Sequence, residues 1–247
     1  MKKLVFIFLL IAETFFAQTG FERGNASYQK GNYTEAITEY ESVLASKKQS
    51  AELYFNLGNC YYKLNKVAPA IYNYEKALVL NPNDPEIKNN LHFAQKLTID
   101  EIKVVPKVGF EKMLRDFTGM FYYDTWAWFG VGFAVLFLLF FIGYYFSGTT
   151  LLKRIFFIGM FVVIFFIIIS ILAAIFEKRH YEHEKPAIVF AEMASLKAEP
   201  KASGSDVFVL HEGAKVFVLE VLDNWKKIQL TDGTEGWIES NAIKEVK

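Results

Sequence analysis

Two long apolar runs constrain this chain more than any other feature. No charged residue occurs from Thr125 to Leu152 or from Ile155 to Phe176. A helix rises about 1.5 Å per residue, so each run can cross the hydrocarbon core of a bilayer, which is about 30 Å thick. We therefore predict transmembrane helices at 125–147 and 155–176, joined by a loop at 148–154. The alternative is a helix pair buried inside a soluble protein, and uncharged runs of this length argue against it.

The N-terminus, MKKLVFIFLLIAETFFAQTG, has the pattern of a secretory signal. Lys2 and Lys3 precede a short apolar core, and the small Ala17 would end a signal peptide of residues 1–17. Cleaved or kept as an anchor, this segment would place the region from Gln18 to the first span outside the cytoplasm. The loop with Lys153 and Arg154 would then face the cytoplasm, as the positive-inside rule expects. The total Lys and Arg count around the spans favours the reverse orientation, but the signal acts first and is expected to dominate.

A linker at 98–124 precedes the first span and carries an amphipathic pattern. Its apolar residues recur at spacings of three and four, which places them on one face of a helix; they are Phe110, Met113, Leu114, Phe117 and Phe121. Such a helix would lie either on the membrane surface or against the preceding domain. The sequence leaves both alternatives open.

The N-terminal region repeats itself at a fixed distance of 34 residues. A period of this length is typical of stacked helical hairpins. The identical pairs are Phe21/Phe55, Gly24/Gly58, Asn25/Asn59, Tyr28/Tyr62, Ala36/Ala70, Ile37/Ile71, Tyr40/Tyr74, Glu41/Glu75 and Leu44/Leu78. We expect the small side chains at Gly58 and Ala70 to let two helices approach closely, and Pro82 to end the second helix.

The second copy, AELYFNLGNCYYKLNKVAPAIYNYEKALVLNP, resembles the tetratricopeptide repeat. The resemblance rests on Tyr54, Leu57, Gly58, Tyr61, Ala70, Tyr74, Ala77 and Pro82. It implies an all-α solenoid at 18–97, with about two repeats and a capping helix over 85–97. In this family one face of the repeats forms a groove that holds extended peptides or helices.

A partner-binding groove is therefore expected on the first helix of each copy. Residues at i, i+4 and i+7 share a face that differs from the Gly58 face; they are Phe21, Asn25, Tyr28, Phe55, Asn59 and Tyr62. Aromatic side chains often anchor interfaces, and amide side chains can pair with a peptide backbone. The alternative is that these residues pack against a neighbouring helix. Cys60, the only cysteine, is interpreted as a buried and inert thiol.

After a linker at 177–186, the pattern changes to the alternation of short β-strands. Turn signals at Glu212-Gly213, Asp223-Asn224 and Asp232-Gly233 predict a small all-β barrel at 187–247. The stretches EGAKVFVLE, NWKKIQL and DGTEGWI resemble successive strands of bacterial SH3-like domains. Trp225 and Trp237 lie on two late strands, where a core role is the default and a binding surface is the alternative.

The sequence carries no recognisable catalytic motif, phosphate-binding loop or metal motif. His180 and His183 are two ligands beside a membrane and make a weak metal site. Lys and Arg number 27, as do Asp and Glu, and without a basic stripe there is no reason to expect nucleic acid as a partner. We expect a protein that binds rather than catalyses, without a cofactor.

The expected fold class is a multidomain membrane protein: an all-α tetratricopeptide solenoid, two transmembrane helices and a small all-β SH3-like barrel. The whole chain resembles the BatE type of the Bacteroides aerotolerance (Bat) operon proteins, with DTWAW entering the first span and VLHEGAKV opening the barrel. The resemblance implies a scaffold or adaptor of the bacterial inner membrane with both domains in the periplasm. It also implies partners: Bat proteins with von Willebrand A domains and a MoxR-type ATPase, in envelope or oxidative stress.

The rival interpretation is a cell-wall protein. In that case the SH3-like barrel would bind peptidoglycan, and the repeats would recruit an envelope enzyme.

Overall fold

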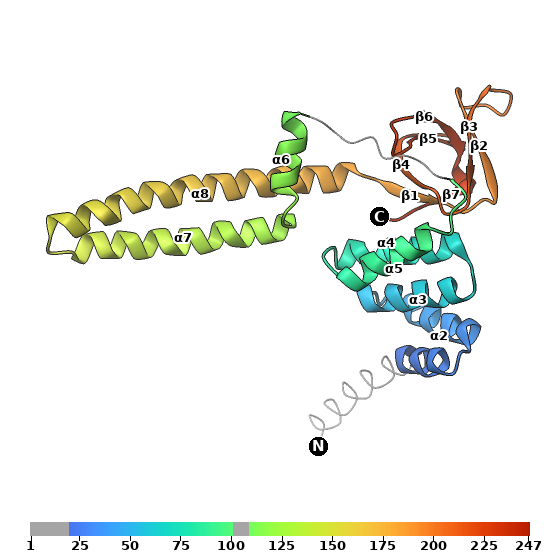
Figure 1. The fold of residues 1–247 in the computed structure, drawn as a ribbon, viewed down its shortest axis with the longest axis horizontal. Helices are drawn as coiled ribbons and strands as arrows, with labels where there is room; N and C mark the ends of the chain where they lie inside the picture. Colours follow the sequence, from blue (N-terminus) through green and yellow to red (C-terminus); the bar gives the residue numbers. More distant parts are fainter. Residues whose placement is uncertain (1–19, 101–108) are drawn as a thin grey trace, which may run out of the picture. The chain divides into compact units, whose positions relative to one another are not determined.

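The computed structural model describes residues 20–100 and 109–247, which form two compact units. One unit joins the N-terminal helices to the C-terminal strands, and the other holds the two long apolar helices (Figure 1). The expected signal peptide at 1–17 lies outside the described residues. The expected fold class is confirmed: a helical repeat region, two long apolar helices and a C-terminal antiparallel sheet.

The helical repeats begin with a helix whose described part is 20–29. Four helices come after it, namely α2 (Tyr33–Ala45), α3 (Ala51–Lys63), α4 (Val67–Leu80) and α5 (Pro85–Gln95). The Ser50 side chain caps α3 by accepting a hydrogen bond from the Leu53 amide at 3.1 Å. Asp84 caps α5 in the same way, with Pro85 in its first turn. The helix α5 covers the second hairpin, where the sequence predicted a capping helix.

Glycine permits the close contact within each hairpin. A Cβ atom added at Gly58 would lie 2.6 Å from two ring carbons of Tyr74, and one added at Gly24 would lie 2.4 Å from the ring of Tyr40. Both tyrosine rings are almost completely buried. The small residue therefore makes room for the ring of the second helix, which explains why both members recur with the period of the repeat.

The C-terminal sheet is antiparallel and has seven strands in the order β3-β2-β6-β5-β4-β1-β7. Their bounds are β1 (Pro186–Val189), β2 (Met193–Lys197), β3 (Asp206–His211), β4 (Lys215–Leu222), β5 (Trp225–Gln229), β6 (Glu235–Glu239) and β7 (Ile243–Glu245). Its core is aliphatic and includes Leu196, Ile228 and Ile238. Trp225 and Trp237 lie on β5 and β6, as expected, but both are only half-buried and neither belongs to this core.

The sheet and the repeats pack on each other through α4 and β1. Ile188 of β1 and Val246 are buried in the same apolar cluster as Ile71. At the side of this cluster the rings of Tyr72 and Phe190 meet edge to face at 5.5 Å. The Lys244 ammonium lies over both rings, 5.3 Å and 4.9 Å from their centroids.

Two buried carboxylates extend this interface with charged contacts. The Lys215 ammonium donates to both oxygens of Glu75 at 2.7 and 2.8 Å, and the Glu75 side chain is 8% exposed. Asp100 accepts from the backbone amide of His211 at 2.6 Å, and its other oxygen lies 2.8 Å from the Nδ1 atom of the same histidine. Between these contacts, the turn at Gly213 lies so close that an added Cβ would be 2.8 Å from Thr98. The repeats and the sheet therefore form one body.

The second unit contains α6 (Phe110–Thr118), α7 (Tyr123–Phe146) and α8 (Thr150–His183). The two long helices run side by side as a hairpin (Figure 1). Small residues permit this contact, because an added Cβ at Gly159 would meet the Phe140 ring at 2.4 Å and one at Gly143 would meet Phe156 at 2.8 Å. Both helices are long and apolar enough to cross a membrane.

The helix α8 is longer than the expected span at 155–176. It begins at Thr150, so the expected loop at 148–154 is largely helical, and it continues to His183 through most of the expected linker at 177–186. Glu177 to His183 contains no helix breaker, and ion pairs Lys178–Glu182 at 3.8 Å and His180–Glu184 at 2.8 Å support the added turns. Pro186 disfavours helical backbone at the residue before it, which ends the helix.

Candidate binding groove

A pocket of about 290 Å³ opens on the repeats. Helices α3, α4 and α5 and the first helix contribute its walls, which are formed by Tyr28, Asn59, Tyr62, Lys63, Tyr74, Glu86, Asn90 and Phe93. Four aromatic rings and two amides dominate this lining, with one cation and one carboxylate. Three of the six expected groove residues, Tyr28, Asn59 and Tyr62, therefore lie around one cavity.

The asparagines of the expected groove belong to a hydrogen-bond network that recurs with the repeat. The Asn25 side-chain oxygen accepts from the Tyr40 hydroxyl at 2.6 Å and from the Asn56 amide at 3.1 Å. The Asn59 oxygen accepts from the Tyr74 hydroxyl at 2.7 Å and from the Asn90 amide at 2.9 Å. Each asparagine thus joins the two helices of its own hairpin to the first helix of the next, and the side-chain amide nitrogen is the group that can serve a ligand.

The phenylalanines of the expected groove also have a packing role. Phe21 contacts the Tyr40 ring at 5.7 Å, and Phe55 contacts the Tyr74 ring at 5.9 Å with nearly the same tilt. The premise that these aromatic and amide residues recur without a packing reason is therefore corrected. Phe21, Asn25 and Phe55 hold the hairpins together and do not line the described pocket.

The tyrosines at the pocket are partly buried and combine an apolar ring with a polar hydroxyl. Tyr28 meets the Tyr33 ring edge to face at 5.3 Å, and desolvation by burial raises the pKa of Tyr28. Burial also raises the pKa of Tyr74. Both hydroxyls therefore remain neutral across the physiological pH range, and can donate hydrogen bonds to a partner or to neighbouring side chains.

Sequence reasoning missed the part of the pocket that comes from α5. Asn90 repeats the role of Asn56, 34 residues later, in bonding the asparagine of the preceding hairpin. This shared spacing was the available signal. Phe93 and Glu86 have no counterpart in the repeat pattern, and Phe93 is 46% exposed beside the cavity.

Cys60 is completely buried in the core of the repeats. Desolvation by burial raises the pKa of its thiol to about 12. Since the thiolate is the reactive form, this cysteine has the inert, structural character that its surroundings in the sequence predict.

A second pocket, of about 500 Å³, lies on the sheet. Trp225 at the start of β5 forms part of it, together with Met193, Ser195, Glu239 and Asn241. Lys197 also lines it and is paired with Asp206 at 2.7 Å. Trp237 is not part of this lining; it lies opposite Lys227 on the neighbouring strand. Of the two expected tryptophans, only Trp225 is thus positioned in a cavity.

Among the residues that the structure describes, no group of three His, Cys, Asp or Glu side chains is arranged to hold a metal ion. His180 contacts Arg115 and is paired with Glu184. The expected weak metal site at His180 and His183 therefore lacks a third ligand in the described part of the chain.

Comparison with known families assigns both ends of the chain. Residues 24–65 match a TPR repeat model, and residues 51–84 match a tetratricopeptide repeat model. Residues 194–244 match the bacterial SH3 domain. A search of curated proteins found no match. The chain thus combines domains of kinds associated with protein–protein interaction, and in the SH3 case also with peptidoglycan, with two helices able to cross a membrane.

Proposed function

We propose that this protein is a non-enzymatic scaffold of a bacterial inner membrane, anchored by α7 and α8, which binds a protein segment in the groove of its repeats. The observation that supports this most strongly is the single body formed by the repeats and the SH3 domain. One half precedes the two apolar helices and the other half comes after them. The two halves can pack together only on the same side of a membrane, so α7 and α8 would cross as a hairpin.

The groove remains accessible in this body. The sheet contacts the repeats through residues such as Tyr72, Glu75 and Asp100. In the described part of the chain, none of the residues that line the groove pocket takes part in those contacts. The SH3 domain would therefore brace the repeats without blocking their ligand site.

The lining suits an extended or helical protein segment with apolar side chains. Rigid aromatic rings such as Tyr62 and Phe93 offer apolar area with little loss of conformational entropy. The amides of Asn59 and Asn90 supply donors for a peptide backbone. Lys63 and Glu86 add one charge of each sign, which fits a segment of mixed charge better than a strongly acidic or basic one.

The resemblance to the BatE type suggests the setting of this scaffold. Its partners would be membrane proteins with von Willebrand A domains, served by a MoxR-type ATPase, in a Bat-type complex that responds to envelope or oxidative stress. The N-terminal signal would place both domains in the periplasm. The family supplies this setting, whereas the groove supplies the contact.

The test is copurification of partners from native membranes. Phe93→Ala removes an exposed ring of the groove, and Leu80→Ala is a matched control because Leu80 is similarly exposed, at 47%, and lies outside the pocket. Phe93→Ala should lose the partners that wild type and Leu80→Ala retain, while all three proteins show the same protection of Cys60 from alkylation. Retention of every partner by Phe93→Ala and by Tyr62→Ala would refute the groove as the binding site.

A second candidate function is binding of peptidoglycan by the SH3 domain. The pocket beside Trp225 favours it, because an aromatic ring next to Ser195, Glu239 and Asn241 can stack on a sugar while polar groups pair with its hydroxyls. The intact protein in detergent should then be pulled down by isolated cell-wall material, and Trp225→Ala should not. Equal recovery of Trp225→Ala and wild type would exclude this pocket.

A further inference from the structure

Helix α6 is fixed to the two long helices by polar contacts. The Thr118 hydroxyl donates to Glu177, and the Arg115 guanidinium contacts His180 and lies 3.8 Å from Glu184. The indole nitrogen of Trp126 donates to the Thr118 carbonyl at 2.7 Å. These contacts hold α6 crosswise against α8, immediately beyond the last residues of its apolar stretch (Figure 1).

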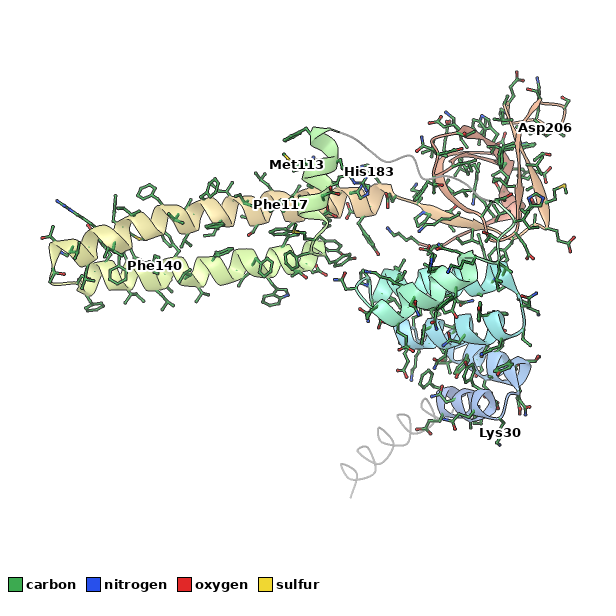
Figure 2. All side chains as sticks on the ribbon, in the orientation of Figure 1. Lys30, Met113, Phe117, Phe140, His183 and Asp206 are labelled. Carbon is green, nitrogen blue, oxygen red and sulfur yellow. The ribbon has the colours of Figure 1, made fainter. Side chains whose placement is uncertain are left out.

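One face of α6 is apolar and has no protein partner within the described part of this unit. Phe110, Met113 and Phe117 are 73%, 63% and 44% exposed. Lys112 and Asp116 are also exposed but lie on another face, at a helical angle far from these three. Met113 and Phe117 project from the side of α6 toward which the apolar parts of α7 and α8 extend, whereas His183 lies on the other side (Figure 2).

The apolar face of α6 is continuous with the apolar surface of the long helices. The Phe117 ring contacts Trp126 at 5.4 Å, and Phe121 contacts Trp126 at 5.5 Å and Phe129 at 5.1 Å. Most large side chains of α7 and α8 are exposed, so the surface that they form must be covered by an apolar medium. The medium that covers α7 and α8 would reach α6 at its edge.

We propose that α6 is an interfacial helix that binds the boundary between lipid headgroups and acyl chains. Its axis lies across the spans, its apolar face is directed toward their hydrocarbon level, and its charged face is directed elsewhere, which is the arrangement of a helix lying in a membrane surface. The contacts to Glu177 and His180 then lie at headgroup depth. The bilayer surface would cross α8 near these residues, and the last two turns of α8 would stand outside the membrane.

The experiment uses the full chain with Cys60 replaced by Ala, reconstituted in phosphatidylethanolamine–phosphatidylglycerol vesicles. A nitroxide label is placed at Met113→Cys on the apolar face, and at Asp116→Cys as the matched control on the polar face of the same helix. Collision with dissolved oxygen, which concentrates in lipid, is compared with collision with a water-soluble nickel complex. Phe110→Cys and Lys112→Cys repeat the comparison, in case one labelled variant does not fold.

The labels at 113 and 110 should collide strongly with oxygen and weakly with nickel, and the labels at 116 and 112 should show the reverse. A label at 113 that collides with nickel as strongly as the label at 116 would mean that the face lies in water. A label at 113 shielded from both reagents would mean that protein covers the face, either the repeats or a second copy. Either result would overturn the proposal.

Discussion

Replacement of Gly58 by leucine should destabilise the repeats strongly. The first added carbon alone would lie 2.6 Å from the Tyr74 ring, whereas carbon atoms in contact normally lie about 3.5–4.0 Å apart. The ring cannot move away easily, because it is 1% exposed, touches Phe55 and donates its hydroxyl proton to Asn59. Overpacking of this kind costs about 1–3 kcal/mol, and loss of the hydroxyl contact adds about 0.5–1.5 kcal/mol.

Cys60 provides the measurement. It is the only cysteine, it is fully buried two residues from Gly58, and unfolding of the repeats exposes it to a maleimide. Trp fluorescence would be less useful, because all four tryptophans lie outside the repeats. With a urea slope of about 1–3 kcal/mol per molar, Gly58→Leu should lower the urea midpoint of Cys60 labelling by about 1–2 M.

Two further variants make this prediction specific. Glu52→Leu introduces the same side chain at an exposed position of the same helix, and should change the free energy of unfolding by less than about 1 kcal/mol. In a Tyr74→Ala background the ring is absent, so the added cost of Gly58→Leu should shrink. An unchanged midpoint for Gly58→Leu, or an equal cost with and without the Tyr74 ring, would refute the assigned helix contact.

Further predictions concern the interface between the two domains and the buried thiol. Lys215→Met leaves the Glu75 carboxylate buried without its partner, which should cost about 3–5 kcal/mol, and Lys215→Met with Glu75→Leu should recover most of it in the same urea titration. Gly213→Val should separate the SH3 domain from the repeats, since a side chain there meets Thr98 at 2.8 Å on backbone with a φ of +87°; hydrogen exchange around Tyr72 should then accelerate while exchange in the sheet core around Ile228 does not. Because burial raises the pKa of Cys60 from 9.0 to about 12, its contribution to stability is complete below pH 9 and is lost as the pH rises toward 12, where only the unfolded thiol ionises first; Cys60→Ala should flatten the fall of the urea midpoint in that interval.

Local patterns in the sequence were sufficient to predict the elements of the fold. The period of 34 residues located the hairpins, and the Gly58 contact could be deduced from residue size. The uncharged runs located α7 and α8. The extension of α8 to His183 was missed because charged residues were taken to end the span, although charge ends only the apolar stretch and leaves the helix free to continue.

The packing of the SH3 domain on α4 could not be predicted from the sequence. Its contacts join residues that are far apart in the chain, such as Glu75 with Lys215 and Asp100 with His211. A lysine at the start of a strand and a glutamate in a helix carry no sign of each other, and each looks like an ordinary surface charge. The groove was predicted in part, since Tyr28, Asn59 and Tyr62 line its pocket while Phe21, Asn25 and Phe55 pack the hairpins.

The central claim is that the repeats and the SH3 domain lie on one side of the membrane, joined by a helical hairpin. In a Cys60→Ala chain, single cysteines at Lys48→Cys, Gly148→Cys and Lys201→Cys report on the repeats, the turn between the long helices and the SH3 domain, and all three positions are exposed or open. A membrane-impermeant maleimide applied to spheroplasts should label positions 48 and 201, and should label position 148 only after the membrane is permeabilised. The mirror pattern would keep the hairpin and reverse its orientation. Labelling of only one of positions 48 and 201 in intact spheroplasts would contradict the account.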